Sequence, residues 1–353
     1  MTIPLRERLR LVLGKTLTED EVLGRFQFGE LLGTGATCKV YAALDATTNA
    51  KVAIKVFDKA KLIELRQSIA VRAHKELAVH RVCRRLRKII SEIEILRAID
   101  HPNIIKFFGA YETSHRICIV FEHVKGADLL DYLTKKGRLC EAKATFVFQQ
   151  IFSAVRYCHE RNIYHRDLKL ENVLVRSDLH VKVIDFGLAE RRHGLLDTVC
   201  GTPLYSSPEV LFSDSQFECS GRFQGAPADV WSVGVMLFAL LTGCAPFDDS
   251  TFETLRYDVS RNRITYPAHI SDAAKGLLKT MLTFDPQVRP SITDILDYKW
   301  LNPEDVLTAR EYTAIDTSPV NAFVRITHQK HIQSHEGSDK TICSSASSDE
   351  LAI

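Results

Sequence analysis

The octapeptide H-R-D-L-K-L-E-N at residues 165–172 constrains this chain more than any other segment. It places Asp167, Lys169 and Asn172 within six positions, although Ile-Tyr precedes it and Val-Leu-Val follows it. Burying a charged group costs free energy unless the charge is paired or hydrogen-bonded. The fold must therefore bring polar partners to this segment, which indicates a functional site and not simple packing.

Three further motifs stand around the octapeptide. V-A-I-K occupies residues 52–55, D-F-G begins 18 positions after Asp167 (185 − 167), and S-P-E occupies residues 207–209. In this order the four motifs resemble those of protein kinases, which read V-A-I-K, H-R-D-L-x-x-x-N, D-F-G and A-P-E. The sequences of residues 131–133 and 169–172 resemble those of the AMP-activated-kinase-like branch of the calcium/calmodulin-dependent kinase group.

The resemblance implies a role for each polar residue of these motifs. Asp167 would be the catalytic base that accepts the proton of the substrate hydroxyl, and Asn172 and Asp185 would hold Mg²⁺. Lys169 is typical of serine/threonine kinases and would neutralise charge on the transferred phosphoryl group. The implied reaction is transfer of the γ-phosphoryl group of Mg-ATP to a Ser or Thr hydroxyl.

A glycine-containing turn follows the start of strand-like alternation at Phe26. Residues 31–41 resemble the loop that covers the ATP phosphates, where glycine lets backbone N–H groups approach an anion closely. The match is incomplete, because Cys38 replaces the third glycine and Thr37 replaces the aromatic residue often found at the tip. A plain hairpin turn at Gly33 and Gly35 is the alternative interpretation.

Lys55 needs a carboxylate partner, and the resemblance assigns Glu92 of the helix called αC to it. The apolar residues at 89, 93 and 96 follow helical spacing and predict one buried stripe beside Glu92. Glu94 is the alternative partner. Lys55 itself would contact the α- and β-phosphates of ATP.

The remaining nucleotide contacts are also implied by the resemblance. The strand 117–121 and the segment after it resemble the last N-lobe strand and the hinge, with Phe121 as a large gatekeeper residue. Asp128 has a second interpretation as a helix N-cap. The implied ATP-binding residues are Leu32, Gly33, Thr34, Gly35, Val40, Ala53, Lys55, Glu122, Val124, Asp128 and Leu174.

The activation segment contains Thr198, at a position that is phosphorylated in many family members. A phosphate there requires basic partners; Arg166 is one candidate, and Lys88 with Arg191 or Arg192 are others. Phosphorylation would then bring the αC helix and the catalytic loop into register. An ordinary exposed threonine is the alternative.

Three residues are assigned structural roles. Glu209 would pair with Arg289 and tie the activation segment to the C-lobe, and Asp229 would cap the backbone of the catalytic loop. His159, on the long helix before that loop, is expected to be a packing residue.

The predicted fold is α+β, the bilobal protein kinase fold with a small β-sheet N-lobe and a larger helical C-lobe. Residues 1–25 form an N-terminal extension, expected to be a short amphipathic helix that packs or frays. The kinase domain is predicted at 26–301, with an N-lobe at 26–124 and a C-lobe at 125–301. A mostly disordered tail is expected at 302–353, where Ser, Thr and His replace the apolar rhythm.

Two inserts depart from the family pattern. Lys55 and Glu92 lie 37 positions apart (92 − 55), and the extra stretch at about 62–87 is basic. We interpret it as an extended or doubled αC helix with a solvated basic face; a docking surface for an acidic partner or for acidic segments of the chain is the alternative. The second insert lies at about 212–224.

Composition restricts the remaining classes. A net charge of +2 gives no global basic field for nucleic acid, and nine cysteines without a C-x-x-C pair indicate a reducing compartment. The N-terminus lacks a signal-peptide pattern. The apolar run at 230–241 is too short to span a bilayer, which takes about 20 residues. We expect a cytoplasmic protein, with the nucleus as the alternative location.

Protein substrates and an upstream activating kinase are the implied partners. Glu171 and Asp128 suggest acceptors with basic residues upstream. The oligomeric state is not indicated. Two other classes stay open: a pseudokinase scaffold that binds nucleotide without turnover, and a small-molecule kinase of the same fold.

Overall fold

The computed structural model describes residues 5–13, 15–35, 37–64, 75–196, 199–213 and 222–301. The chain divides into two compact units. One unit comprises Met1–Lys125 and Asp185–Glu190, and the other comprises Gly126–Ile184 and Arg191–Ile353. The predicted tail at 302–353 and most of the second insert lie outside the described residues.

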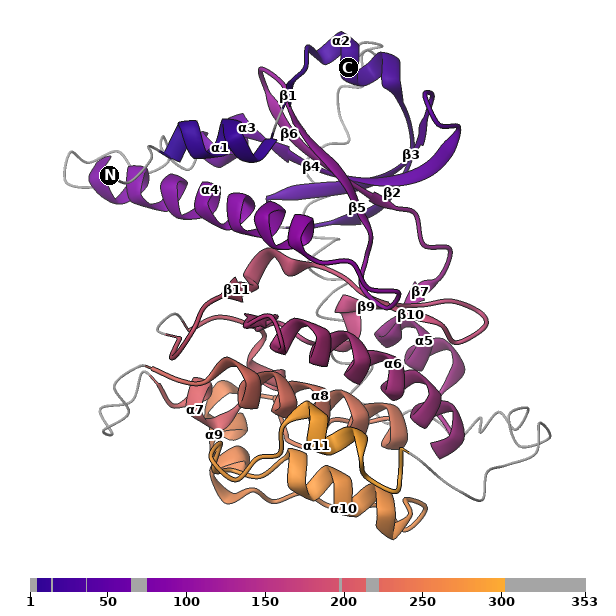
Figure 1. Cartoon of the computed structure of the whole chain (residues 1–353). Helices are drawn as coiled ribbons and strands as arrows, with labels where there is room; N and C mark the ends of the chain where they lie inside the picture. Colours follow the sequence, from indigo (N-terminus) through magenta and orange to yellow (C-terminus); the bar gives the residue numbers. More distant parts are fainter. Residues whose placement is uncertain are drawn as a thin grey trace, which may run out of the picture. The chain divides into compact units, whose positions relative to one another are not determined.

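The first unit is built on a six-stranded sheet with the order β1-β5-β6-β4-β3-β2 (Figure 1). Neighbouring strands are antiparallel except β1 and β5, which are parallel. The strands are β1 (Lys15–Thr16), β2 (Phe26–Thr34), β3 (Cys38–Asp45), β4 (Ala50–Asp58), β5 (Phe107–Glu112) and β6 (Arg116–Glu122). Short turns join β2 to β3 and β3 to β4, as antiparallel pairing allows.

Alternation along β4 divides its side chains between two faces of the sheet. Val52 and Ile54 belong to a buried cluster that also contains Leu17, Val22 and Phe26. Lys55 therefore points to the opposite face. The helices of this unit are α1 (Leu5–Leu13), α2 (Glu19–Arg25), α3 (Lys59–Glu64), α4 (Lys75–Ala98) and the 3₁₀ turn η3 (Phe186–Leu188).

The N-terminal extension is part of the first unit and contains more structure than the single helix expected. Thr18 and Glu21 form a capping box that starts α2. Arg25 at the end of α2 pairs with Asp45 at 2.9 Å, and its guanidinium lies over the ring of Tyr111. The hydrogen bond from Arg25 lowers the pKa of Asp45 to about 2. The extension is thereby fixed to the sheet at several points.

The basic insert is partly described. Its second half belongs to α4, one 24-residue helix that also carries Glu92. Arg84, Arg87 and Lys88 are exposed on this helix. This arrangement supports the interpretation as an extended αC helix with a solvated basic face. Residues 65–74 lie outside the described residues, and the docking alternative stays a prediction.

The second unit is mainly helical. Its helices are α5 (Leu129–Lys136), α6 (Glu141–His159), α7 (Pro208–Leu211), α8 (Gly225–Thr242), α9 (Phe252–Arg261), α10 (Asp272–Met281) and α11 (Ile292–Leu296), with 3₁₀ turns η2 (Leu170–Asn172) and η4 (Pro203–Tyr205). The short strands are β7 (Ala127–Asp128), β8 (Ile163–Tyr164), β9 (Val173–Val175), β10 (Val181–Val183) and, at the boundary of the units in the sequence, β11 (Glu190–Arg191). β10, β9 and β7 form one antiparallel sheet. The predicted α+β class is confirmed.

Helix α8 forms the core of the second unit. Among the described helices it alone has the length and apolar composition of a membrane span, and 78% of that stretch is buried inside the structure. Its first residue, Gly225, lies against the ring of Tyr164: an added Cβ would meet that ring at 2.3 Å. A side chain at this position would push β8 away from the helix.

Arg289 forms an enclosed ion pair in this unit. Its side chain is 0% exposed and makes a bidentate contact with the Glu209 carboxylate, at 2.8 and 3.0 Å. The guanidinium also donates to the carbonyls of Pro227, Thr283 and Phe284. Every charged atom of the pair thus has a partner, which is the condition under which a buried ion pair is tolerated.

We predict that Arg289→Ala lowers the free energy of unfolding by about 3–5 kcal/mol, because it leaves the Glu209 carboxylate buried and unpaired. Chemical denaturation followed by circular dichroism measures the loss. Arg263→Ala, at an exposed position, is the control and should change stability by less than about 0.5 kcal/mol. Equal effects of the two variants would contradict a structural role for the pair.

Candidate active site

The first unit holds a buried ionic cluster centred on Lys55 of β4. Its ammonium lies 2.7 Å from Oε1 of Glu92 on α4 and 2.9 Å from Oδ1 of Asp185, just before η3. The Glu92 side chain is 3% exposed, whereas that of Asp185 is 47% exposed. Glu92 therefore holds the lysine from the inside, and Asp185 presents a carboxylate to the outside.

The charges of this cluster stabilise one another. Burial alone would lower the pKa of Lys55, but the carboxylates of Glu92 and Asp185 raise it, so the ammonium stays protonated. Burial raises the pKa of Glu92, and the ammonium of Lys55 opposes that effect. The alternative partner, Glu94, instead makes a bidentate contact with Arg8 of α1.

The turn that carries Asp185 is tight. Asp185 has a left-handed backbone conformation, with φ of 59°, and its carboxylate accepts from the N–H of Gly187. A Cβ at Gly187 would lie 3.1 Å from that carboxylate and 3.4 Å from Glu92. A glycine thus allows the turn to approach both acids closely.

Three of the implied nucleotide-binding residues of the first unit lie on one face of the sheet. Val40 is the cross-strand partner of Lys55, and Ala53 precedes Lys55 by two residues on the same strand. Directly opposed residues share a face of an antiparallel sheet, so these three side chains lie on one face. Phe121, opposite Ala53, shares that face and is buried.

The glycine turn closes between β2 and β3. The N–H of Gly35 donates to the carbonyl of Cys38 at 2.8 Å, while Gly33 has no atom within 4 Å of an added Cβ. Leu32 is exposed before the turn. Burial raises the pKa of the Cys38 thiol, which favours its neutral form. Ala36 lies outside the described residues.

The end of the first unit carries the residues assigned to the hinge. The N–H of Glu122 donates to the carbonyl of Lys106, and its carboxylate accepts from the N–H of Lys106. Val124 follows and is half-buried. The backbone here is held by the segment before β5, which fixes the direction of the strand end.

The second unit builds a network around the Asp167 carboxylate, which is 12% exposed. Its Oδ1 accepts from the hydroxyl of Thr202 at 2.9 Å, and its Oδ2 lies 3.2 Å from the ammonium of Lys169. The side-chain amide of Asn172 donates to Oδ2 at 3.1 Å and to the Asp167 carbonyl at 2.8 Å. The carboxylate is thereby fixed in one orientation by three side chains.

Asp229 of α8 holds the backbone of the same loop. Its carboxylate accepts from the N–H groups of His165 and Arg166, each at 2.9 Å. Arg166 has φ of 65°, a conformation that costs an ordinary residue about 1–3 kcal/mol. The contacts to Asp229 offset this cost and position the residue that follows.

His159 contributes a contact that its sequence position did not suggest. Its Nε2 lies 2.9 Å from Oδ2 of Asp229, the oxygen that also accepts from the N–H of His165. Burial alone would raise the pKa of Asp229, but the hydrogen bond and charge of His159 lower it. A histidine one helix away from a charged motif is a weak signal, because packing histidines are common in such helices.

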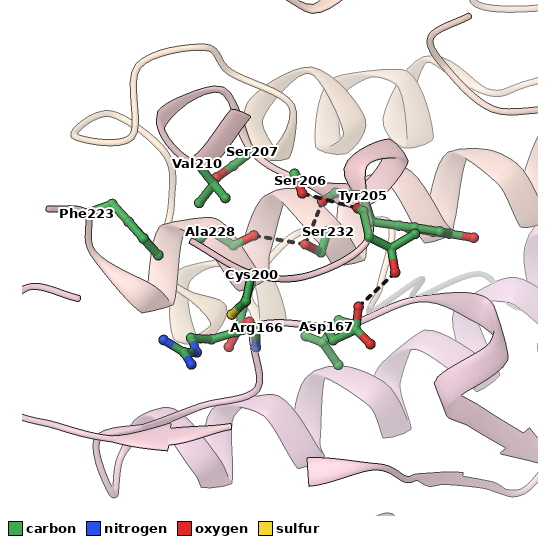
Figure 2. A pocket seen from close by; sticks show the side chains of 13 residues that line it. Arg166, Asp167, Cys200, Tyr205, Ser206, Ser207, Val210, Phe223, Ala228 and Ser232 are labelled. Atoms are coloured by element: carbon green, nitrogen blue, oxygen red, sulfur yellow. Dashed lines mark hydrogen bonds between the residues drawn. The ribbon is translucent and has the colours of Figure 1, made fainter. Parts of the chain in front are cut away.

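The segment that begins at Val199, after residues 197–198, which lie outside the described residues, packs against the catalytic loop. Gly201 has φ of 110°, and an added Cβ would meet the Arg166 carbonyl at 2.8 Å. A cavity of about 20 Å³ lies between this segment and the catalytic loop, and Cys200, Thr202 and Ser207 form part of its wall. Figure 2 shows Cys200 and Ser207 among the side chains that line it. Ser207, which stands where kinases have alanine, has a buried hydroxyl with no hydrogen-bond partner among the residues that the structure describes. The cavity has room for about one water molecule.

Two acidic residues and Leu174 complete the predicted set. Asp128 accepts from the N–H of Asp131 and caps α5, as its alternative interpretation states. Glu171 accepts from the hydroxyl of Tyr205 at 3.4 Å, and burial raises the pKa of its carboxyl. Leu174 is a half-buried residue of β9. Thr198 lies outside the described residues.

The oxygen ligands predicted for Mg²⁺ come from two segments. Asn172 keeps its side-chain carbonyl oxygen without a partner among the described residues, since its amide group makes both of its contacts. Within the described ranges, no cluster of three or more His, Cys, Asp and Glu side chains could hold a metal ion. Two oxygen ligands still suit Mg²⁺, which keeps several waters and takes few protein ligands.

Comparison with known proteins gives one consistent result. Residues 26–301 match the protein kinase domain. The chain is 40% identical over 283 residues to the SNF1-related protein kinase catalytic subunit alpha KIN12 of Arabidopsis thaliana, covering 80% of this chain and 52% of that protein. It is 41% identical over 285 residues to a probable serine/threonine-protein kinase of Dictyostelium discoideum, covering 80% and 31%.

A third relative is the CBL-interacting protein kinase 32 of Oryza sativa subsp. japonica, 38% identical over 283 residues, with 79% of this chain and 59% of that protein covered. The chain thus spans less than two thirds of the length of these three relatives. The matched domain includes every motif described above. The chain belongs to the protein kinase family, beside the SNF1-related and CBL-interacting kinases.

Proposed function

We propose that this chain transfers the γ-phosphoryl group of ATP to Ser or Thr hydroxyls of protein substrates. The observation that carries the proposal is the Asp167 carboxylate, held by Asn172, Lys169 and Thr202. Such a carboxylate can accept the proton of an acceptor hydroxyl. Its fixed orientation reduces the cost of aligning the reactants.

Each neighbour of Asp167 then has a chemical role. The ammonium of Lys169 bridges the Asp167 carboxylate and the hydroxyl of Thr202, at 3.2 and 2.9 Å. It lies where it can stabilise negative charge on the transferred group. Thr202 orients the carboxylate toward the acceptor. Catalysis of this kind rests on positioning and charge stabilisation and not on covalent chemistry.

Other residues of the site would bind the nucleotide and its metal ion. Lys55, kept protonated by Glu92 and Asp185, would bind the α- and β-phosphates. Asp185 and Asn172 would hold Mg²⁺, and both offer the oxygen ligands that this ion prefers. When bound, the ion neutralises phosphate charge during transfer.

The two competing classes, a pseudokinase and a small-molecule kinase, predict different features of the sequence. A pseudokinase would be expected to miss one of the catalytic groups, and this chain contains Lys55, Glu92, Asp167, Asn172 and Asp185. A small-molecule kinase would not need the segment at 201–209 as a platform for a peptide. Both classes predict no phosphorylation of peptides.

The partners and location are part of the proposal. The half-buried carboxylates of Glu171 and Asp128 favour substrates with basic residues upstream of the acceptor. An upstream kinase would phosphorylate Thr198. We place the protein in the cytoplasm, with the nucleus as the alternative; the six cysteines whose side chains the structure describes are free thiols. Imaging of the tagged full chain tests this location.

We predict that Asp167→Asn lowers kcat by about 10²–10⁴-fold, because the acceptor hydroxyl loses its base. The KM for ATP should change little, since Lys55, and not Asp167, is assigned to the phosphates of ATP. Steady-state transfer of ³²P from Mg-ATP to a peptide library measures both constants, and Asp272→Asn on an exposed helix start is the control. Nucleotide binding without turnover by the wild-type chain would indicate a pseudokinase.

A second prediction concerns substrate choice. Glu171→Gln should raise the KM for peptides with arginine upstream of the acceptor by about tenfold, since a charged hydrogen bond contributes about 1.5 kcal/mol. Matched peptides with alanine in place of arginine should show no change. An equal change for both peptides would argue against recognition of basic residues by Glu171.

The third prediction concerns activation. Thr198→Ala should lower activity by about tenfold or more, because charge-assisted hydrogen bonds to the phosphate contribute about 1.5 kcal/mol each. Arg166→Ala should remove the response to phosphorylation, and Thr293→Ala, at an exposed position, should leave it intact. Mass spectrometry of the full chain with parallel rate measurements checks this. A fully active Thr198→Ala protein would end the proposal of a switch.

A further inference from the structure

Helix α1 in the N-terminal extension packs against α4, the helix that carries Glu92 (Figure 1). Leu9, Val12 and Leu13 are buried, at 3–7% exposure, and their spacing places them on one stripe of α1. On the same helix Arg10 and Leu11 are exposed. One face of α1 is therefore buried against the rest of the first unit.

An ion pair joins the two helices across 86 positions of sequence. Nε of Arg8 lies 2.9 Å from Oε1 of Glu94, and Nη2 lies 2.6 Å from Oε2. This bidentate geometry fixes both the distance and the orientation of the two side chains. The hydrogen bond to Glu94 raises the pKa of Arg8.

Glu94 and Glu92 lie on nearly opposite sides of α4, because two residues of a helix rotate by about 200°. Glu92 faces Lys55 at 2.7 Å, while Glu94 faces Arg8. Ile90, one turn before Glu94, is 1% exposed. α4 is thus held between two ion pairs, one on each side.

The extension that carries α1 is itself tied to the sheet. β1 pairs in parallel with β5, Leu17 enters the cluster beneath α2, and the hydroxyl of Thr113 donates to the carboxylate of Glu19. The sheet also carries Lys55 on β4. Helix α1 and Lys55 are therefore fixed to one frame, and α4 lies between them.

We propose that α1 is an intramolecular brace for α4, and that Arg8 is a positioning residue that acts through Glu94 to keep Glu92 against Lys55. The proposal rests on the proposed phosphoryl transfer. A rotation or outward shift of α4 would break both ion pairs together. The chain would in this way supply, from its own first 25 residues, a contact that sets the geometry of the nucleotide site.

The test is a charge exchange in the full chain. Arg8→Glu and Glu94→Arg should each lower kcat/KM for ATP by about three- to tenfold, since exposed ion pairs and like-charge contacts have effects of this size. The KM for peptide should stay unchanged. The double variant, which restores an opposite-charge pair, should recover activity to within about twofold of wild type.

Arg10→Glu makes the same charge change on an exposed position of the same helix and should have no effect. In a Glu92→Gln background, Arg8→Glu should add no further loss, because the contact through which it acts is already weakened. A loss in that background equal to the loss in wild type would overturn the proposal.

Hydrogen–deuterium exchange provides a readout that does not depend on turnover. Arg8→Glu should increase amide exchange in residues 89–98, and Arg10→Glu should not. Unchanged exchange in Arg8→Glu would overturn the brace even if the wild-type chain proved inactive. Conversely, increased exchange in a chain that transfers no phosphate would support the brace and reject the proposed function.

Discussion

The second unit depends on the buried carboxylate of Asp229. A charged group at 1% exposure is tolerated only when its oxygens are fully partnered. Two backbone N–H groups and His159 supply those partners. In return the carboxylate holds Arg166 in a conformation that the chain would otherwise avoid. The direction of the Asp167 side chain, and with it the network of Lys169 and Thr202, follows from this contact.

Much of this arrangement was predictable from sequence, because the motifs are short and their members are close in the chain. The H-R-D-L-x-x-x-N segment contains both Asp167 and Asn172, and the structure places them within hydrogen-bond distance. Helical spacing predicted a buried stripe beside Glu92, with Glu94 as the alternative partner of Lys55. The structure places Glu92 at Lys55 and Glu94 at Arg8. The catalytic roles of these residues stay predictions.

The contacts that sequence reasoning missed join segments without a motif. Arg8 is one of several charged residues in the N-terminal extension, and no motif near it in the sequence identifies Glu94 as its partner. His159 lies on a helix where a packing role is the ordinary expectation. The hydrogen bond from Tyr205 to Glu171 depends on the fold of the segment after Gly201. Such pairs are set by tertiary geometry, which the spacing of residues does not encode.

The parallel strand β1 bears on where the folded part of this chain begins. The kinase family match starts at residue 26, yet β1 ends ten residues before that position. β1 pairs with β5 and forms one edge of the sheet. A chain trimmed to the matched range would leave β5 as an open edge, with unsatisfied N–H and C=O groups that can template pairing with another molecule. It would also uncover the aliphatic side chains beneath α2. The folding unit is therefore larger than the matched kinase domain, and recombinant forms that include β1 and α2 should resist self-association better than shorter ones.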